Sequence, residues 1–173
     1  SSVNSKTHMD DSRNIFIGTI ASGITTATNN VSMGHLSLNS LTSGSSNISL
    51  GPGSLWFNTS GSQNISLGNL ALRSNTTGSH NVSLGNYSGA SNTTGDYNLA
   101  LGASALYFTK GSGNVAVGAL AMRNQSSSDD VEYSYNTAVG YSSLMGINNP
   151  ESNTGLENTA IGAKAMILNV SGS

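Results

Sequence analysis

Residues that carry most enzyme chemistry are few and scattered in this sequence. The histidines, His8, His35 and His80, lie in different contexts, without the i, i+4 spacing of metal ligands on one helix. We interpret each of them as a polar surface residue. A glycosidase needs two facing carboxylates at a set separation, but the acidic residues are dispersed, and Asp96 is far from the others. We therefore predict no catalytic residue, no metal site and no cofactor.

Two short motifs are similar to ion-binding or phosphate-binding loops. The segment Gly51-Pro52-Gly53 has the G-x-G form, but no helix pattern or lysine follows it, so we interpret these glycines as turn residues. The segment 129–132 (DDVE) could supply oxygen ligands to Ca²⁺; we favour a solvated acidic loop. Cysteine is absent, which excludes disulfides, thiolate zinc sites and thiol catalysis.

Aromatic residues and arginines share one position of a repeat that is described below. An exposed aromatic ring beside a polar or cationic side chain commonly holds the face of a sugar or another protein. The alternative is that these rings fill a subunit interface. The candidate ligand-binding residues are Trp56, Phe57, Arg73, Tyr107, Phe108 and Arg123.

The composition argues against helices and against nucleic acid as a partner. Only 8% of the residues are charged, against about 25% in typical globular domains. Asn, Ser, Thr and Gly fill the gaps between short apolar runs and favour turns. A net charge of −2 provides no basic stripe for phosphates. No apolar run approaches the ~20 residues that span a bilayer, so we expect no membrane insertion.

A repeated pentad must position all of these residues. Its pattern is Asn, apolar, small, apolar, Gly, as in NISLG at 64–68, and the chain contains nine copies. The steps between successive pentad glycines are 16, 17, 17, 17, 17, 16, 22 and 22 residues. These glycines are Gly18, Gly34, Gly51, Gly68, Gly85, Gly102, Gly118, Gly140 and Gly162.

A second element follows most pentad glycines at a fixed distance. Ser or Ala stands three residues after the glycine, and Leu or Met stands four after it, as in Ala71-Leu72. The first repeat departs from this pattern, and Gly89 replaces the large residue in another. A polar corner such as SNTTG at 74–78 comes next. We predict that each repeat is a strand, a glycine bend, a short second strand and a turn.

Alternation within the pentad predicts a strand with two different faces. We expect the large residues, such as Ile65 and Leu67, to line a narrow core. The small residues between them would face outward and permit close approach by another backbone, with Phe16 as the exception. The pentad asparagines would form a hydrogen-bonded ladder between coils, and we do not interpret their Asn-x-Ser/Thr triplets as glycan sites. The ladder column is Asn47, Asn64, Asn81, Asn98 and Asn114.

These features predict an all-β β-solenoid, either a β-roll or a β-prism, of about nine coils of 16–22 residues. The repeat domain spans 14–168, with insertions at 123–135 and 145–157 that project from one side. Residues 1–13 form an N-terminal segment and 169–173 a C-terminal tail. Each coil has few large apolar groups to offset an ordering cost of ~1.5 kcal/mol per residue. We therefore expect an intertwined or side-by-side homotrimer; a monomeric solenoid is the alternative.

The pentads, the downstream Ala-Leu pairs and the Asn-Thr-Thr-Gly corners resemble the head repeats of trimeric autotransporter adhesins. They resemble even more the NTAVG…AL…NTTG arrays of phage tail-fibre and bacterial fibre proteins, which often carry an endosialidase-type chaperone domain that is absent here. The resemblance covers about 14–166. It implies three chains around an axis, displayed extracellularly on a cell surface or a virion. The 22-residue repeats depart from this pattern.

We therefore expect a non-enzymatic fibre or adhesin segment, a structural rod that contributes to binding a host surface receptor, possibly a glycan. One alternative is a carbohydrate-cleaving fibre enzyme, which release of reducing ends from host glycans would reveal. Another is an ice-binding or surface-binding solenoid. That function needs a flat, regular threonine array, whereas threonine pairs such as Thr76-Thr77 and Thr93-Thr94 look sporadic. A hexapeptide acyltransferase helix fits poorly because the chain lacks a six-residue step.

Overall fold

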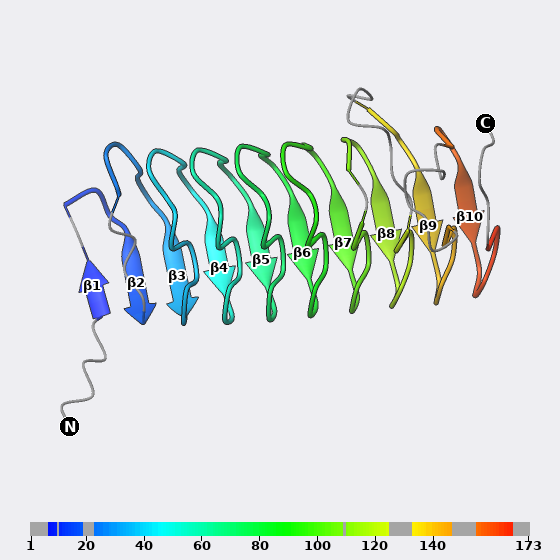
Figure 1. The fold of residues 1–173 in the computed structure, drawn as a ribbon, viewed down its shortest axis with the longest axis horizontal. Helices are drawn as coiled ribbons and strands as arrows, with labels where there is room; N and C mark the ends of the chain where they lie inside the picture. Colours follow the sequence, from blue (N-terminus) through cyan, green and yellow to red (C-terminus); the bar gives the residue numbers. More distant parts are fainter. Residues whose placement is uncertain are drawn as a thin grey trace.

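The computed structural model describes residues 7–9, 11–18, 23–108, 110–124, 133–146 and 155–167. Within these residues the chain is all β, without a helix, and its coils stack along one direction (Figure 1). The strands are β1 Thr7–Met9, β2 Ile15–Gly18, β3 Val31–Gly34, β4 Ile48–Leu50, β5 Ile65–Leu67, β6 Val82–Leu84, β7 Leu99–Leu101, β8 Val115–Val117, β9 Thr137–Val139 and β10 Thr159–Ile161.

The strands β2 to β10 form one parallel sheet in sequence order, which confirms the predicted β-solenoid. Residues one repeat apart are paired directly: Ser49 lies opposite Ser66, and Leu50 lies opposite Leu67. The longer steps keep this register, since Val117 pairs with Val139. The pentad therefore marks the successive coils, as its spacing predicts.

The strand β1 was not predicted. It pairs antiparallel with β2, and His8 lies opposite Phe16. It adds an antiparallel strand to the first edge of the parallel sheet, within the segment that the sequence left without structure. Pairing at this edge satisfies backbone groups of β2 that the next coil does not reach.

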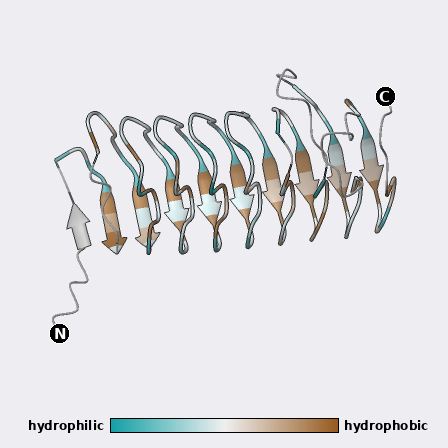
Figure 2. Ribbon diagram, viewed as in Figure 1, coloured by the Kyte–Doolittle hydropathy of each residue, from teal (hydrophilic) through white to brown (hydrophobic). Residues whose placement is uncertain are grey.

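The prediction of which strand face lines the core is wrong. The small central residues of the strands point inward: Ser49, Ser66 and Ala116 are fully buried. The large residues on either side, such as Ile65 and Leu67, face outward and are exposed or half-buried. These apolar residues appear as brown bands along the strands in Figure 2. The inside holds small side chains because the opposite wall of each coil already fills it.

That opposite wall is formed by the element that follows the pentad glycine. Ser54 Oγ is 2.7 Å from Ser66 Oγ, so this segment runs directly behind the strand. The next residue, Leu55, is fully buried and has a φ of +49°. The predicted second strand is instead a series of turns, since the left-handed backbone at each Leu interrupts an extended conformation. The inward-pointing Leu or Met column supplies most of the large core residues.

The core changes along the stack. One cluster of buried residues extends from Phe16 to Leu72, and a second begins at Ala100. Between them lies the coil in which Gly89 replaces the large residue, as the sequence predicts. A Cβ at Gly89 would lie 3.0 Å from Leu72 Cδ2, so Leu72 partly occupies this gap. In the first coil Phe16 is fully buried, and this larger residue fills the inner strand position in a repeat that lacks the Leu.

The predicted asparagine ladder is confirmed. Asn64 Nδ2 donates hydrogen bonds to Asn47 Oδ1 (3.1 Å) and to the Gly78 carbonyl (2.9 Å). The Asn64 backbone N–H also donates to Asn47 Oδ1 (3.0 Å). This backbone-to-side-chain bond recurs at every step from Asn14 to Asn158. The ladder satisfies buried amides that would otherwise destabilise a narrow core.

The structure contains two further ladders that the sequence analysis missed. Asn75 Nδ2 donates to Asn58 Oδ1 (2.9 Å), and Asn92 continues this second amide row. A threonine column runs beside it on five coils, and each hydroxyl except the last donates to the backbone carbonyl of the next threonine. Its members are Thr25, Thr42, Thr59, Thr76 and Thr93. This single column is regular, but the next position is Ser in two of the five coils, so the threonine pairs are irregular, as the sequence indicates.

Candidate ligand-binding and interaction surfaces

The first candidate cluster lies on the rear wall, the part of each coil that runs behind the sheet. Trp56 and Phe57 follow the buried Leu55, and their rings are nearly parallel, with centroids 5.2 Å apart and planes inclined by 4°. Arg73, from the next coil, places its guanidinium carbon 5.9 Å from the Phe57 ring centroid. Phe57 is 41% exposed, and Trp56 is half-buried. We call Trp56, Phe57 and Arg73 rear cluster 1.

The second candidate cluster repeats this arrangement farther along the same wall. Tyr107 and Phe108 pack edge to face with centroids 4.4 Å apart. The guanidinium carbon of Arg123 lies 5.8 Å from the centroid of the Tyr107 ring. Tyr87, which was not predicted, adds a third ring 5.9 Å from Tyr107. We call Tyr87, Tyr107, Phe108 and Arg123 rear cluster 2.

The predicted column therefore forms two separate clusters rather than one continuous site. Within each cluster, backbone bonds hold the aromatic and arginine coils in register: Phe57 N–H donates to the Arg73 carbonyl, and Phe108 N–H donates to the Arg123 carbonyl. The buried Ala90 stands at the equivalent position between the clusters. Trp56 and Tyr107 are three coils apart, or about 14 Å at the usual spacing of strands. A ligand that contacts both clusters must be extended.

The two arginines are not neutralised within the described part of the chain. Both lie over rings, and Arg123 Nε is buried without a hydrogen-bond partner. The described carboxylates Asp11, Asp96 and Glu157 all stand within three residues before a ladder asparagine, at the corner where the strands begin. The rear wall is consequently a cationic and aromatic surface, separated from the acidic side chains that the structure describes.

A second surface, which the sequence analysis placed in the core, is the outward face of the sheet. It presents two large apolar side chains per strand along most of β2 to β10, and several are well exposed. We call these residues the outer sheet face. Its most exposed members are Met33, Ile48, Ile65, Leu84 and Ile161. Ile161, on the last strand, is 72% exposed. Soluble monomers rarely expose a contiguous apolar stripe of this extent.

A third row of rings borders this face at the corner that precedes each ladder asparagine. His80 and Tyr97 stack with centroids 4.7 Å apart, and Tyr133 stacks on Tyr135 at 5.3 Å. His80, Tyr97 and Tyr135 all have φ between +50° and +60°, a conformation that costs most residues energy. The sequence could have predicted this row, because His80, Tyr97 and Tyr135 each stand directly before the asparagine of a pentad.

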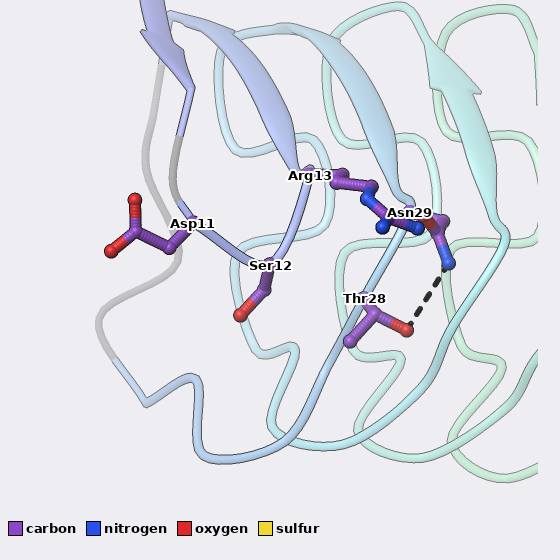
Figure 3. Close-up of a pocket in the computed structure, with 5 residues that line it drawn as sticks. All are labelled: Asp11, Ser12, Arg13, Thr28 and Asn29. Atoms are coloured by element: carbon purple, nitrogen blue, oxygen red, sulfur yellow. Dashed lines mark hydrogen bonds between the residues drawn. The ribbon is translucent and has the colours of Figure 1, made fainter.

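A recess at the first coil is a weaker candidate for a binding site. Asp11, Ser12, Arg13, Thr28 and Asn29 surround an open polar depression (Figure 3). Asn29 Nδ2 donates a hydrogen bond to Thr28 Oγ1 at 3.4 Å, and the Asp11 carboxylate points away from this pair in Figure 3. These groups do not converge on a common point, so we assign no function to this recess.

No metal centre forms among the described residues, since no three His, Cys, Asp or Glu side chains come together there. The acidic segment 129–132 lies outside the described residues, as do 125–128 and 147–154 of the two predicted insertions. Gly51 and Gly53 have φ of +128° and +64°, which agrees with their interpretation as turn glycines. No described segment is a helix that is long and apolar enough to cross a bilayer.

Comparisons of this chain with protein-family models, with curated proteins and with solved structures gave no match.

Proposed function

We propose that this chain is a rod-like segment of a homotrimeric fibre, which presents receptor-binding groups at a cell surface or on a virion without catalysing a reaction. In this proposal the outer sheet faces of three copies pack against one another around the fibre axis. The rear clusters then face away from that axis, where they are accessible to a receptor. The resemblance to adhesin and tail-fibre repeats supports the same arrangement.

The observation that carries the proposal is the exposed apolar outer sheet face. Most coils fill their own interior with a Leu or Met, a small strand residue and the ladder asparagine. Residues such as Ile65 and Leu67 therefore contribute little to closing a coil. Burying apolar area stabilises by about 25 cal/mol per Å², and the described part of this chain leaves the face exposed. A threefold arrangement lets every copy cover its face with two neighbours.

Light scattering on the purified chain tests the assembly. A trimer has three times the 17.6 kDa mass of the chain. We expect this mass at micromolar concentration, and a stable monomer would refute the proposal. A triple variant, Ile48→Thr, Ile65→Thr and Val82→Thr, should dissociate. Thr137 and Thr159 occupy the same strand position, so the coil already accommodates this residue.

Phe57→Ala is the matched control for the triple variant. It removes a comparably exposed apolar side chain, at 41% exposure, from the rear wall instead of the sheet. The proposal expects Phe57→Ala to remain trimeric and the triple variant to become monomeric, while both keep the circular dichroism of a β protein. If both variants keep the assembled mass, the outer sheet face is not the interface.

The ice-binding alternative is favoured by one observation, the regular threonine column. Its hydroxyls, however, donate to backbone carbonyls of the neighbouring coil. The adjacent outward position is Thr in three of the five coils and Ser in the other two, as at Thr77 and Ser60. We therefore interpret the column as a structural ladder. A thermal-hysteresis measurement separates the two functions, because an ice-binding surface slows crystal growth and a structural ladder does not.

A further inference from the structure

We propose that the rear clusters bind an acidic glycan, a polysaccharide whose sugar rings carry carboxylate or sulfate groups. This inference rests on the proposed function and specifies the class of receptor. Rear cluster 1, with Trp56, Phe57 and Arg73, is the primary site. Rear cluster 2 forms a second site of the same chemistry on the same face.

The pairing of rings with guanidinium groups defines the ligand. A flat aromatic side chain packs against the apolar face of a sugar ring, and a guanidinium group donates paired hydrogen bonds to a carboxylate or sulfate. In rear cluster 1 the Arg73 guanidinium lies 5.9 Å from the Phe57 ring centroid, so one sugar can contact both groups. A neutral sugar offers the guanidinium group only hydroxyl acceptors, whereas an acidic sugar offers a charged acceptor that can take two parallel hydrogen bonds.

The charge distribution favours an anionic ligand. The sequence has six Lys or Arg residues, and two of them, Arg73 and Arg123, stand at equivalent positions of the rear wall. Within the described residues neither guanidinium pairs with a carboxylate, and both lie over aromatic rings. An anionic group bound at the rear wall would meet no described acidic side chain there.

The spacing of the clusters favours a polymer. Three coils separate Trp56 from Tyr107, about 14 Å along a rigid stack. One extended glycan can therefore contact both clusters, and the second contact raises the apparent affinity through its effective concentration. Single-stranded nucleic acid also combines rings with anions, but it requires many cations along its path. Two arginines on an otherwise uncharged column do not provide them.

The single tryptophan of the chain reports directly on rear cluster 1, because Trp56 belongs to it. Titration of the full chain with polygalacturonate and with dextran sulfate, followed by Trp56 fluorescence, tests the carboxylate and the sulfate separately. Dextran serves as the neutral glycan, polyaspartate as the anion without sugar rings, and oligo(dT) as the nucleic acid. We expect saturable binding to at least one acidic polysaccharide, and weaker binding to all three comparison polymers.

Substitutions assign the binding to the clusters. Arg73→Gln should weaken the binding by about tenfold or more, since it removes charge-assisted hydrogen bonds to the anionic group. Arg13→Gln, which removes an arginine at the strand-start corner, is the matched control and should leave the affinity unchanged. Raising the salt concentration should weaken the wild-type affinity and should affect Arg73→Gln less.

Three outcomes would overturn the inference: equal binding of dextran and the acidic polymers, tighter binding of oligo(dT) or polyaspartate, or no fluorescence response to any glycan. The wild-type titration decides this without any variant. A trimer that binds no acidic glycan leaves the fibre proposal intact, whereas a monomer that binds one refutes the assembly and keeps the ligand assignment. The two proposals therefore fail separately.

Discussion

Replacing one pentad glycine by alanine separates two reasons why glycine occupies this position. Gly68 has a φ of +138°, which L-residues rarely adopt, and an added Cβ would lie 2.5 Å from the carbonyl oxygen of Gly85 in the next coil. Gly162 has a similar φ of +118°, but no atom of the described residues lies within 4 Å of its added Cβ. Gly162→Ala is therefore destabilised by the unfavourable backbone conformation alone. Gly68→Ala is destabilised by that conformation and also by a collision with the backbone of Gly85.

The expected losses of stability differ accordingly. Holding a non-glycine residue in a sparsely populated φ/ψ region costs about 1–3 kcal/mol, and this applies to both variants. Overpacking against a rigid neighbour costs roughly a further 1–3 kcal/mol, which applies only to Gly68→Ala because the atoms it meets belong to the Gly85 backbone. For a chain of this length ~1 kcal/mol corresponds to about 2–4 °C in the unfolding midpoint. Gly68→Ala should thus unfold some ~2–12 °C below Gly162→Ala.

Thermal and urea unfolding, followed by far-ultraviolet circular dichroism at one fixed protein concentration, measures this difference. The fixed concentration matters because assembly shifts the apparent stability. If the two variants unfold at the same midpoint, close contact between coils does not restrict this position, and the stacking geometry described for the glycine column is wrong. If Gly68→Ala is as stable as the wild type, the left-handed backbone is also wrong.

Three further predictions concern the interior. Asn64→Ala should lower the free energy of unfolding by at least ~2 kcal/mol, because it removes buried amide hydrogen bonds to both neighbouring coils. Gln63→Ala, at the preceding exposed position, should change it little. Leu72→Ala should cost ~2–5 kcal/mol as a core truncation, while Leu67→Ala on the outer sheet face should mainly lower the assembled mass in light scattering. Gly89→Ala should lower the unfolding midpoint, since its Cβ would lie 2.8 Å from a buried hydroxyl and 3.0 Å from Leu72 Cδ2.

The periodicity of the sequence was sufficient to predict the stacking. A fixed step between glycines places equivalent residues over one another, and the register of Leu50 opposite Leu67 confirms it. The asparagine ladder follows from the same step, because a buried amide at each coil has only its neighbours above and below as partners. The column that brings Trp56 next to Arg73 was predicted for the same reason. That this column binds a ligand stays a prediction.

The direction of the strand faces was not predictable from alternation alone. A period of two shows that Ser66 and its large neighbours lie on opposite faces, but not which face is inside. The relevant information was the column of Leu and Met four residues after the glycine. In a coil of 16 or 17 residues the two walls are in contact, with Ser54 Oγ only 2.7 Å from Ser66 Oγ. Such a coil has no room for large residues from both walls.

The left-handed turns were not predicted because the residues at those positions have no intrinsic preference for positive φ. Leucine is a poor choice for positive φ, yet Leu38, Leu55 and Leu72 adopt it. Their backbone N–H groups explain this, because the Leu55 N–H donates to the Ala71 carbonyl of the next coil at 3.0 Å. Inter-coil hydrogen bonds and burial of the side chain outweigh the local preference. Gly89, at +58°, is the one residue of this column that suits the conformation by itself.

The inverted faces also change what the apolar strand residues indicate about function. If Ile65 and Leu67 lined the core, their character would follow from closing the coil and would say nothing about partners. Because the coil closes on Leu72, Ser66 and Asn64 instead, a monomeric solenoid would lose little by carrying threonine at the outward positions, as β9 and β10 do at Thr137 and Thr159. In the proposed fibre, large apolar residues at these positions are stabilised when another chain covers them, and the rear wall is then the surface left free for the proposed ligand.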